Sequence, residues 1–282
     1  MSDRAVNASI TLRPARLLAL AGAVGLATAA CGDRQRAAAP APAAPAPRPA
    51  APLADPVLDR VAILSAVDAA ASSAAAGRTP TANDSLANRR FRMRIAFGCF
   101  GPEPAPAEGV ADAGAPRWSR TADGKAIRLR FTPADWTAGD ATGPAAPGFE
   151  HVGGVWVNQP WMRSEGCPAP GPPTPQVFEL PTTPKVALAL LRAEGASRLG
   201  RADDRAFTFT LRGQGDAPAP DPAQGYRLVL EGRLTPWAEG AVIRCRVNRA
   251  ESRPPCAVGV VLDRLAYEDG ATGETLSEWR PG

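Results

Sequence analysis

The sequence predicts a mainly β domain, an antiparallel β-sandwich or barrel-like fold, with one helix at its N-terminal side. Three patterns support this prediction. Residues 91–97 alternate apolar and basic or small side chains with the period of a strand. About eight to ten short apolar segments, separated by turn residues, extend from there to the end of the chain. Only residues 55–77 combine helical spacing with helix-terminal residues.

The expected helix spans residues 55–77. Asp55 suits the N-cap, Pro56 suits the first turn, and Gly77 suits the position just past the end. Its apolar stripe predicts a face packed on the domain rather than a partner-binding helix. The stripe consists of Val57, Val61, Leu64, Val67 and Ala71. We therefore assign residues 55–88 to an N-terminal helix and loop, and residues 89–282 to the β-rich domain.

The first strands have the clearest signals. In residues 90–97 the apolar positions face inward and Arg90, Arg92 and Arg94 face outward. Residues 118–121 and 125–131 flank Asp123-Gly124, a dipeptide favoured in tight hairpin turns, and therefore predict a β-hairpin.

Later strands are expected from shorter patterns. The run 186–192 is either a buried strand or two helical turns, because its periodicity favours neither. No segment recurs at a fixed period, so the chain is not predicted to be a solenoid or propeller. The other expected strands are residues 153–161, 176–180, 206–211, 226–234, 241–247, 256–267 and 275–279.

A leader precedes the domain. Arg13 and Arg16 stand before fourteen uncharged residues, 17–30, that end in small side chains, the layout of a secretory signal. As a helix this run would rise only about 21 Å, short of the roughly 30 Å hydrocarbon core of a bilayer. We expect residues 1–30 to be a signal peptide rather than a permanent membrane span.

The cleavage region, Thr28, Ala29, Ala30 and Cys31, resembles the lipobox of bacterial lipoproteins. In that family the cysteine is lipidated and becomes the new N-terminus. The resemblance implies lipidation at Cys31 and a membrane anchor in the cell envelope, with the domain facing the periplasm or the exterior. The sequence departs from the family pattern at Thr28, where leucine is usual. The alternative is ordinary cleavage after Ala30 and release of the protein.

Residues 31–54 are expected to form the lipidated cysteine and a tether. From residue 37 to residue 54 the chain is almost only Ala and Pro, which provides no core side chains and favours an extended conformation. A fully polyproline II segment would reach roughly 50 Å at about 3.1 Å per residue. Such a spacer would hold the domain away from a membrane surface.

Four cysteines remain once Cys31 is set aside, an even number that suits a compartment that oxidises thiols. Three pairings are possible. Cys245 and Cys256 flank a turn-like loop, so they can lie side by side across a hairpin, and Cys99 would then pair with Cys167. A zinc site has less support because no CxxC spacing occurs and the only histidine is far away in sequence. No metal or cofactor is expected.

The charge balance argues against a nucleic-acid partner. Without the leader, which holds three arginines and one aspartate, 29 basic and 27 acidic residues remain. Outward arginines would form a basic sheet face if their strands are neighbours, suited to the phosphate or carboxylate groups of an envelope polymer or lipid head group. The alternative is an ordinary solvent-exposed face. The candidate residues are Arg90, Arg92, Arg94, Arg128 and Arg130, with Arg244 and Arg246 as further members.

Catalytic patterns are sparse. His151 is the only histidine, which excludes sites that need a histidine pair, and no GxSxG motif provides a nucleophile for it. A hydrogen-bonded structural histidine is the favoured interpretation. A carboxylate-based hydrolase needs only two acids about 5 to 9 Å apart, and no spacing singles out a pair. The candidate acids are Asp135, Asp140, Glu150, Glu165, Asp203 and Asp204.

Tryptophans at strand ends or in Pro and Gly loops either stack on sugars or fill the ends of the core. They are Trp118, Trp136, Trp156, Trp161 and Trp237. Taken together, the sequence predicts a cell-envelope lipoprotein with a non-catalytic binding or scaffolding role. The partner would be an envelope polymer or a protein. The alternatives are a carbohydrate- or peptidoglycan-binding module and a carboxylate-based hydrolase.

Overall fold

The described part of the domain is mainly β and has one α-helix, which precedes the first long strand, as predicted. The computed structural model describes residues 55–78, 85–102, 114–140, 143–144, 147–157, 163–169, 186–196, 206–215, 217–247 and 253–281. The leader, Cys31, the tether, the expected strand 176–180, Trp161, Asp203 and Asp204 lie outside these residues. Within the described ranges, no helix is long and apolar enough to cross a membrane.

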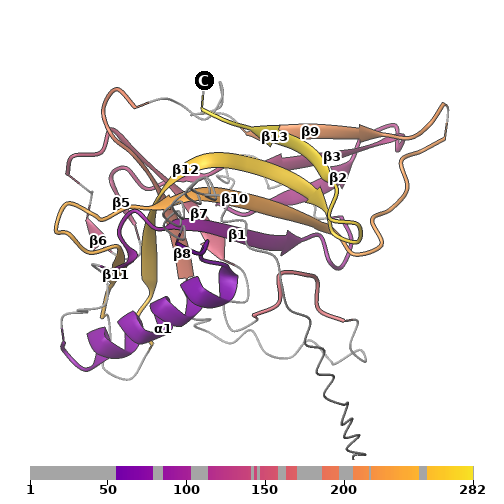
Figure 1. Ribbon diagram of the computed structural model, residues 1–282. Helices are drawn as coiled ribbons and strands as arrows, with labels where there is room; N and C mark the ends of the chain where they lie inside the picture. The colour runs from indigo at the N-terminus through magenta and orange to yellow at the C-terminus, as the bar shows by residue number, and fades with distance from the viewer. Residues whose placement is uncertain are drawn as a thin grey trace, which may run out of the picture. The chain divides into compact units, whose positions relative to one another are not determined.

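Figure 1 shows the arrangement of the elements. The expected strands that fall in the described residues are all present, together with three two-residue strands that the sequence did not indicate. In chain order the elements are α1 (Arg60–Ala75), β1 (Arg90–Phe97), β2 (Arg117–Arg120), β3 (Ala126–Phe131), β4 (Ala134–Asp135), β5 (Gly139–Asp140), β6 (Gly143–Pro144), β7 (His151–Val157), β8 (Val186–Arg192), β9 (Phe207–Arg212), β10 (Tyr226–Leu234), β11 (Ile243–Cys245), β12 (Cys256–Asp269) and β13 (Thr275–Trp279).

The largest sheet is built around β12. Its strand order is β1-β10-β12-β8-β7-β4, and β11 and β13 also pair with β12. The first half of β12 lies between β8 and β11, and its second half lies between β10 and β13. The β8–β12 pair is parallel, which departs from the expected antiparallel arrangement. The reason is topological, since the chain visits β9 in another sheet between these strands and so returns by a crossover rather than a hairpin.

A second sheet, β2-β3-β9, packs on the first through a shared core. The rings of Trp118 and Tyr226 lie 6.1 Å apart, and those of Phe207 and Trp279 lie 5.3 Å apart. The hydroxyl of Tyr267 donates to the carbonyl of Phe207 at 2.7 Å, so a polar link also joins the two layers. The described residues therefore form two packed sheets, with the short ribbon β5–β6 as a separate pair.

The helix begins later than predicted. Asp59, not Asp55, is the N-cap, and its carboxylate accepts from the backbone N–H of Ala62 at 2.8 Å. Leu58 lies alongside β1, where its N–H donates to the carbonyl of Arg90 and its carbonyl accepts from the N–H of Arg92. This pairing keeps the chain extended up to Asp59. At the other end Gly77 has a φ of +67°, which agrees with the predicted stop.

The buried face of α1 differs in part from the predicted stripe. Leu64, Val67 and Ala71 are buried, but Val57 and Val61 are 49% and 45% exposed. The remaining buried positions of the helix are Arg60, Ile63 and Ala70. Because the helix starts at Arg60, Val57 precedes it and Val61 faces solvent. The helix packs on the domain as predicted, but its buried face is rotated around the helix axis relative to the predicted stripe.

The run 186–192, which the sequence left open between a strand and two helical turns, forms strand β8. Leu188 packs in the main core, while the next residue, Ala189, packs in a second apolar cluster with Trp136 and Trp237. Both residues are fully buried. The run lacks a period of two because both faces of this strand are covered, which is typical of strands in the middle of a sheet.

Two disulfides join the four domain cysteines. Cys245 and Cys256 are paired across β11 and β12, with their Cα atoms 4.1 Å apart. Cys99 and Cys167 are joined over a sequence separation of 68 residues, with their Cα atoms 5.4 Å apart. Both pairings are those that the hairpin interpretation predicted.

Candidate functional site

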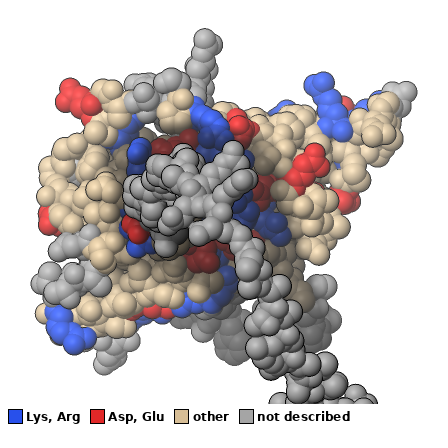
Figure 2. Space-filling view, in the orientation of Figure 1, with Lys and Arg blue, Asp and Glu red and all other residues tan. Residues whose placement is uncertain are grey.

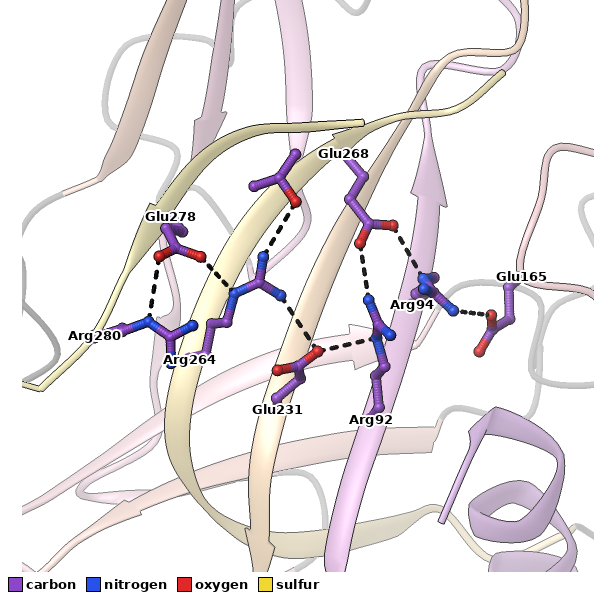
Figure 3. A network of polar contacts seen from close by, with 9 residues as sticks. Arg92, Arg94, Glu165, Glu231, Arg264, Glu268, Glu278 and Arg280 are labelled. Carbon is purple, nitrogen blue, oxygen red and sulfur yellow. Dashed lines mark hydrogen bonds and ion pairs between the residues drawn. The ribbon is translucent and has the colours of Figure 1, made fainter. Parts of the chain in front are cut away.

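The face of β1, β10 and β12 that points away from the main core carries a network of charged side chains. The alternation in β1 that buries Met93 and Ile95 turns Arg92 and Arg94 to this opposite face. The register places Arg92 beside Glu231 of β10, and Glu231 beside Arg264 of β12. Basic and acidic side chains therefore alternate from strand to strand, as Figure 3 shows.

Glu268 lies at the centre of one half of the network. This residue is only 2% exposed to solvent. Its carboxylate accepts from Nη2 of Arg92 at 3.1 Å and from Nε of Arg94 at 3.0 Å. Arg92 also contacts Glu231 at 3.0 Å. One buried carboxylate thus holds two guanidinium groups, which compensates for its loss of hydration.

Arg264 organises the other half. This residue is 8% exposed and donates to Glu278 at 2.8 Å, to Glu231 at 3.3 Å and to the hydroxyl of Thr275 at 3.3 Å. Glu278 also accepts from Arg280 at 3.2 Å. Through Glu231 the two halves are continuous. The labelled network in Figure 3 consists of Arg92, Arg94, Arg264 and Arg280 with Glu165, Glu231, Glu268 and Glu278, and these formal charges balance.

Two pKa shifts show how the network keeps its groups ionised. Burial alone would lower the pKa of Arg94, but the hydrogen bonds and charges of Glu165 and Glu268 outweigh burial and raise this pKa. Hydrogen bonds from Arg264 and Arg280 lower the pKa of Glu278. Both shifts favour the charged forms.

Glu165 belongs to a segment, residues 163–169, that we call the strap. It contacts Arg94 at 2.8 Å, and Arg163 contacts Asp68 of α1 at 2.5 Å. Cys167 fixes the strap covalently to Cys99, just beyond β1. The strap therefore connects the helix, the first strand and the charged face.

A surface hollow of about 330 Å³ lies beside the strap. It is lined by the two exposed valines, Val57 and Val61, and by the charged residues Asp59, Arg92, Arg94 and Glu165. Figure 2 shows basic and acidic side chains intermixed on the face of the molecule seen in that view. The hollow combines apolar surface with charges of both signs.

The predicted basic face is divided between two sheets. Arg90, Arg92 and Arg94 lie on β1 of the large sheet, whereas Arg128 and Arg130 lie on β3, whose neighbours among the described strands are β2 and β9. The condition that their strands be neighbours is therefore not met. Of the further members, Arg244 donates twice to Glu239 at 2.8 Å and stacks over Trp237, with its Cζ 4.1 Å from the ring centroid.

The sequence interpretation missed most of the labelled network. Glu231, Arg264, Glu268 and Glu278 were not singled out, although each lies in a segment expected to be a strand or in its continuation. Alternation within each strand signals which residues face outward. Arg92 and Glu268 are 176 positions apart in the sequence, and no local sequence pattern indicates a contact between residues so far apart.

The catalytic candidates have separate partners. Nδ1 of His151 lies 3.1 Å from the hydroxyl of Thr137, which also accepts from the N–H of Val152. Asp135 accepts from the N–H of Thr137 at 2.9 Å, and this bond lowers the pKa of Asp135. Glu150 lies 3.6 Å from Arg192, Glu165 binds Arg94, and the backbone of Asp140 lies in β5. No group of three or more metal-ligating side chains occurs among the described residues.

Three of the candidate tryptophans are buried. Trp118 packs in the main core, and Trp136 and Trp237 pack in the second apolar cluster. Trp156 is half-buried and its ring lies 5.0 Å from that of Trp136. These four side chains are engaged in packing, as the core-filling interpretation expects.

No family model, curated protein or solved structure matches this chain.

Proposed function

We propose that the chain is a lipid-anchored domain of the cell envelope with a non-catalytic binding or scaffolding role. The observation that carries this proposal is the pairing of the four domain cysteines in two disulfides. Of the five cysteines in the chain, this leaves Cys31, directly after the leader. Disulfides are typical of oxidising compartments, and lipidation requires a free thiol at that position.

The binding surface that we propose is the hollow lined by Val57, Val61, Arg92, Arg94 and Glu165. A polyanion would have to displace glutamates from both arginines, so the balanced network gives little support to a phosphate-rich partner. Exposed apolar side chains next to arginine are typical of protein interfaces. The partner proposed here is therefore another envelope protein.

Substitution of Cys31 by serine tests the anchor. The Cys31→Ser protein is expected to move from the membrane fraction to the soluble fraction, because the acyl chains have no other point of attachment. The measurement is fractionation of host cells followed by mass spectrometry of the N-terminal peptide.

A matched control is Thr28→Leu, which restores the residue usual in the lipobox and should leave the protein membrane-attached. Persistent membrane association of the Cys31→Ser protein would show that the anchor is wrong.

Site-specific photo-crosslinking in the host tests the hollow. A photoreactive residue at Val61 is expected to yield one adduct of defined mass, because this position lies at the proposed interface. The same residue at Val247, which is 49% exposed but does not line the hollow, serves as the control. Equal adducts from both positions, or none from Val61, would rule out the hollow as the binding surface.

A further inference from the structure

Strands β8 and β12 separate partway along the large sheet. They pair in parallel from Val186 and Cys256 to Leu190 and Val260. Val260 also pairs with Leu234 of β10, so β8 and β10 lie on opposite sides of β12. Farther along, β13 takes the side that β8 has left, beginning at Leu265. Residues 261–264 of β12 therefore bridge a change of neighbour, and we call the opening there the fork.

A cavity of about 210 Å³ lies in the fork. Its walls come from the strands that separate and from the second sheet opposite, and they are mostly apolar. The principal lining residues are Gly153 of β7, Leu190 and Leu191 of β8, Phe207 of β9, and Val261 and Leu262 of β12. Elements far apart in sequence thus converge on one apolar space.

Two successive glycines in β7 lie at the wall of this space. A Cβ at Gly154 would lie 2.1 Å from the indole of Trp136, so that indole fills the place of a side chain. A Cβ at Gly153 would lie 3.1 Å from the Cβ of Pro133 and 3.4 Å from the Cβ of Leu190, so a side chain there would crowd the cavity wall. One glycine accommodates a tryptophan, and the other lines the cavity.

The lining includes one charged side chain, that of an arginine. Arg192 lines the cavity, and its Nη2 lies 3.6 Å from a carboxylate oxygen of Glu150. His151 and Thr235 add hydrogen-bonding capacity, with the His151 ring positioned by Thr137. Glu150 lies outside the lining, but it gives the positive charge of Arg192 an acidic neighbour. The rest of the lining is mostly apolar and would strip an anion of its hydration, so the cavity favours an uncharged molecule.

We propose that the fork cavity binds a small uncharged apolar molecule, of the class of a single aromatic ring with a short substituent. An enclosed apolar cavity of about 150 Å³ is known to accept benzene. The fork cavity is somewhat larger and opens to solvent at Ala193, so it has room for one ring. The site is independent of the hollow and of the lipid anchor, so it stands or falls separately from the proposed function.

The test compares benzyl alcohol with benzoate, which have the same ring and differ in charge. Binding to the purified full chain is followed by amide chemical shifts. Benzyl alcohol is expected to give saturable shifts at Gly153, Leu190 and Val261, with an affinity at least about tenfold higher than that of benzoate.

Two variants fill the cavity from different sides. Val261→Phe and Ala193→Phe are each expected to weaken benzyl alcohol binding by at least about tenfold, because the added ring occupies the ligand's volume. Ala193 is exposed at the rim, so its variant remains informative if the Val261 variant does not fold. Val247→Phe, outside the cavity, should bind as the unmodified protein does.

Three results would overturn the proposal. The first is the absence of saturable shifts at the three named positions. The second is unchanged benzyl alcohol binding in a folded Ala193→Phe protein. The third is benzoate binding as tight as that of benzyl alcohol.

Discussion

Replacing both Cys99 and Cys167 by serine is expected to lower the free energy of unfolding by about 4 kcal/mol under oxidising conditions. The cross-link closes a long loop, with a separation of 68 residues, and therefore restricts the unfolded chain strongly. It also fixes the strap that brings Glu165 to Arg94. Chemical denaturation in the presence and absence of reductant measures the loss.

The second disulfide provides the matched control. Cys245 and Cys256 are separated by only 11 residues, so their double serine variant should lose about 3 kcal/mol. The order of the two losses is the decisive result. A smaller loss for the Cys99–Cys167 pair would mean that the strap is strained or that the reduced unfolded state retains structure around it.

Glu268→Ala is expected to lower the free energy of unfolding by about 2 to 3 kcal/mol. The substitution leaves Arg92 and Arg94 on the face of the sheet without their shared buried carboxylate. We place the loss below the usual range for a broken buried ion pair because these arginines keep Glu231 and Glu165 as partners and are partly exposed. Urea denaturation near neutral pH measures it.

Glu278→Ala is the control at the exposed edge of the same network. Its side chain is 44% exposed and its carboxylate binds Arg264 and Arg280, so a clearly smaller loss is expected. Equal losses for the two variants would contradict the view that Glu268 is the central acceptor, and would assign the network to ordinary surface pairing.

Much of the sheet was predictable because one face of most strands is buried and the other is exposed. In β1 the alternation identifies Phe91, Met93, Ile95 and Phe97 as core residues, and each is buried. Strand β8 could not be assigned because both of its faces are covered. The start of α1 was misplaced because Asp55 and Asp59 are both good caps, and only the pairing of Leu58 with β1 distinguishes them.

The candidate site was predictable only in part. Alternation correctly placed Arg92 and Arg94 on one face of their strand. It could not reveal that Arg128 and Arg130 belong to another sheet, or that Glu268 lies against Arg92, because neighbours across strands depend on topology. The fork cavity has no local signal in the sequence, because it arises where β8 and β12 separate.

The position of β12 in the chain has a consequence for biosynthesis. Four described strands pair with β12, and three of them, β8, β10 and β11, precede it in the chain. A nascent chain that has reached β10 contains the strands on both sides of β12, which are β1 and β10 on one side and β4, β7 and β8 on the other. It does not yet contain β12, which joins them. Stable folding therefore waits until synthesis has passed Asp269, and the many long-range pairings then favour slow folding. Until β12 has been made, the translated part of the chain therefore offers little resistance to unfolding.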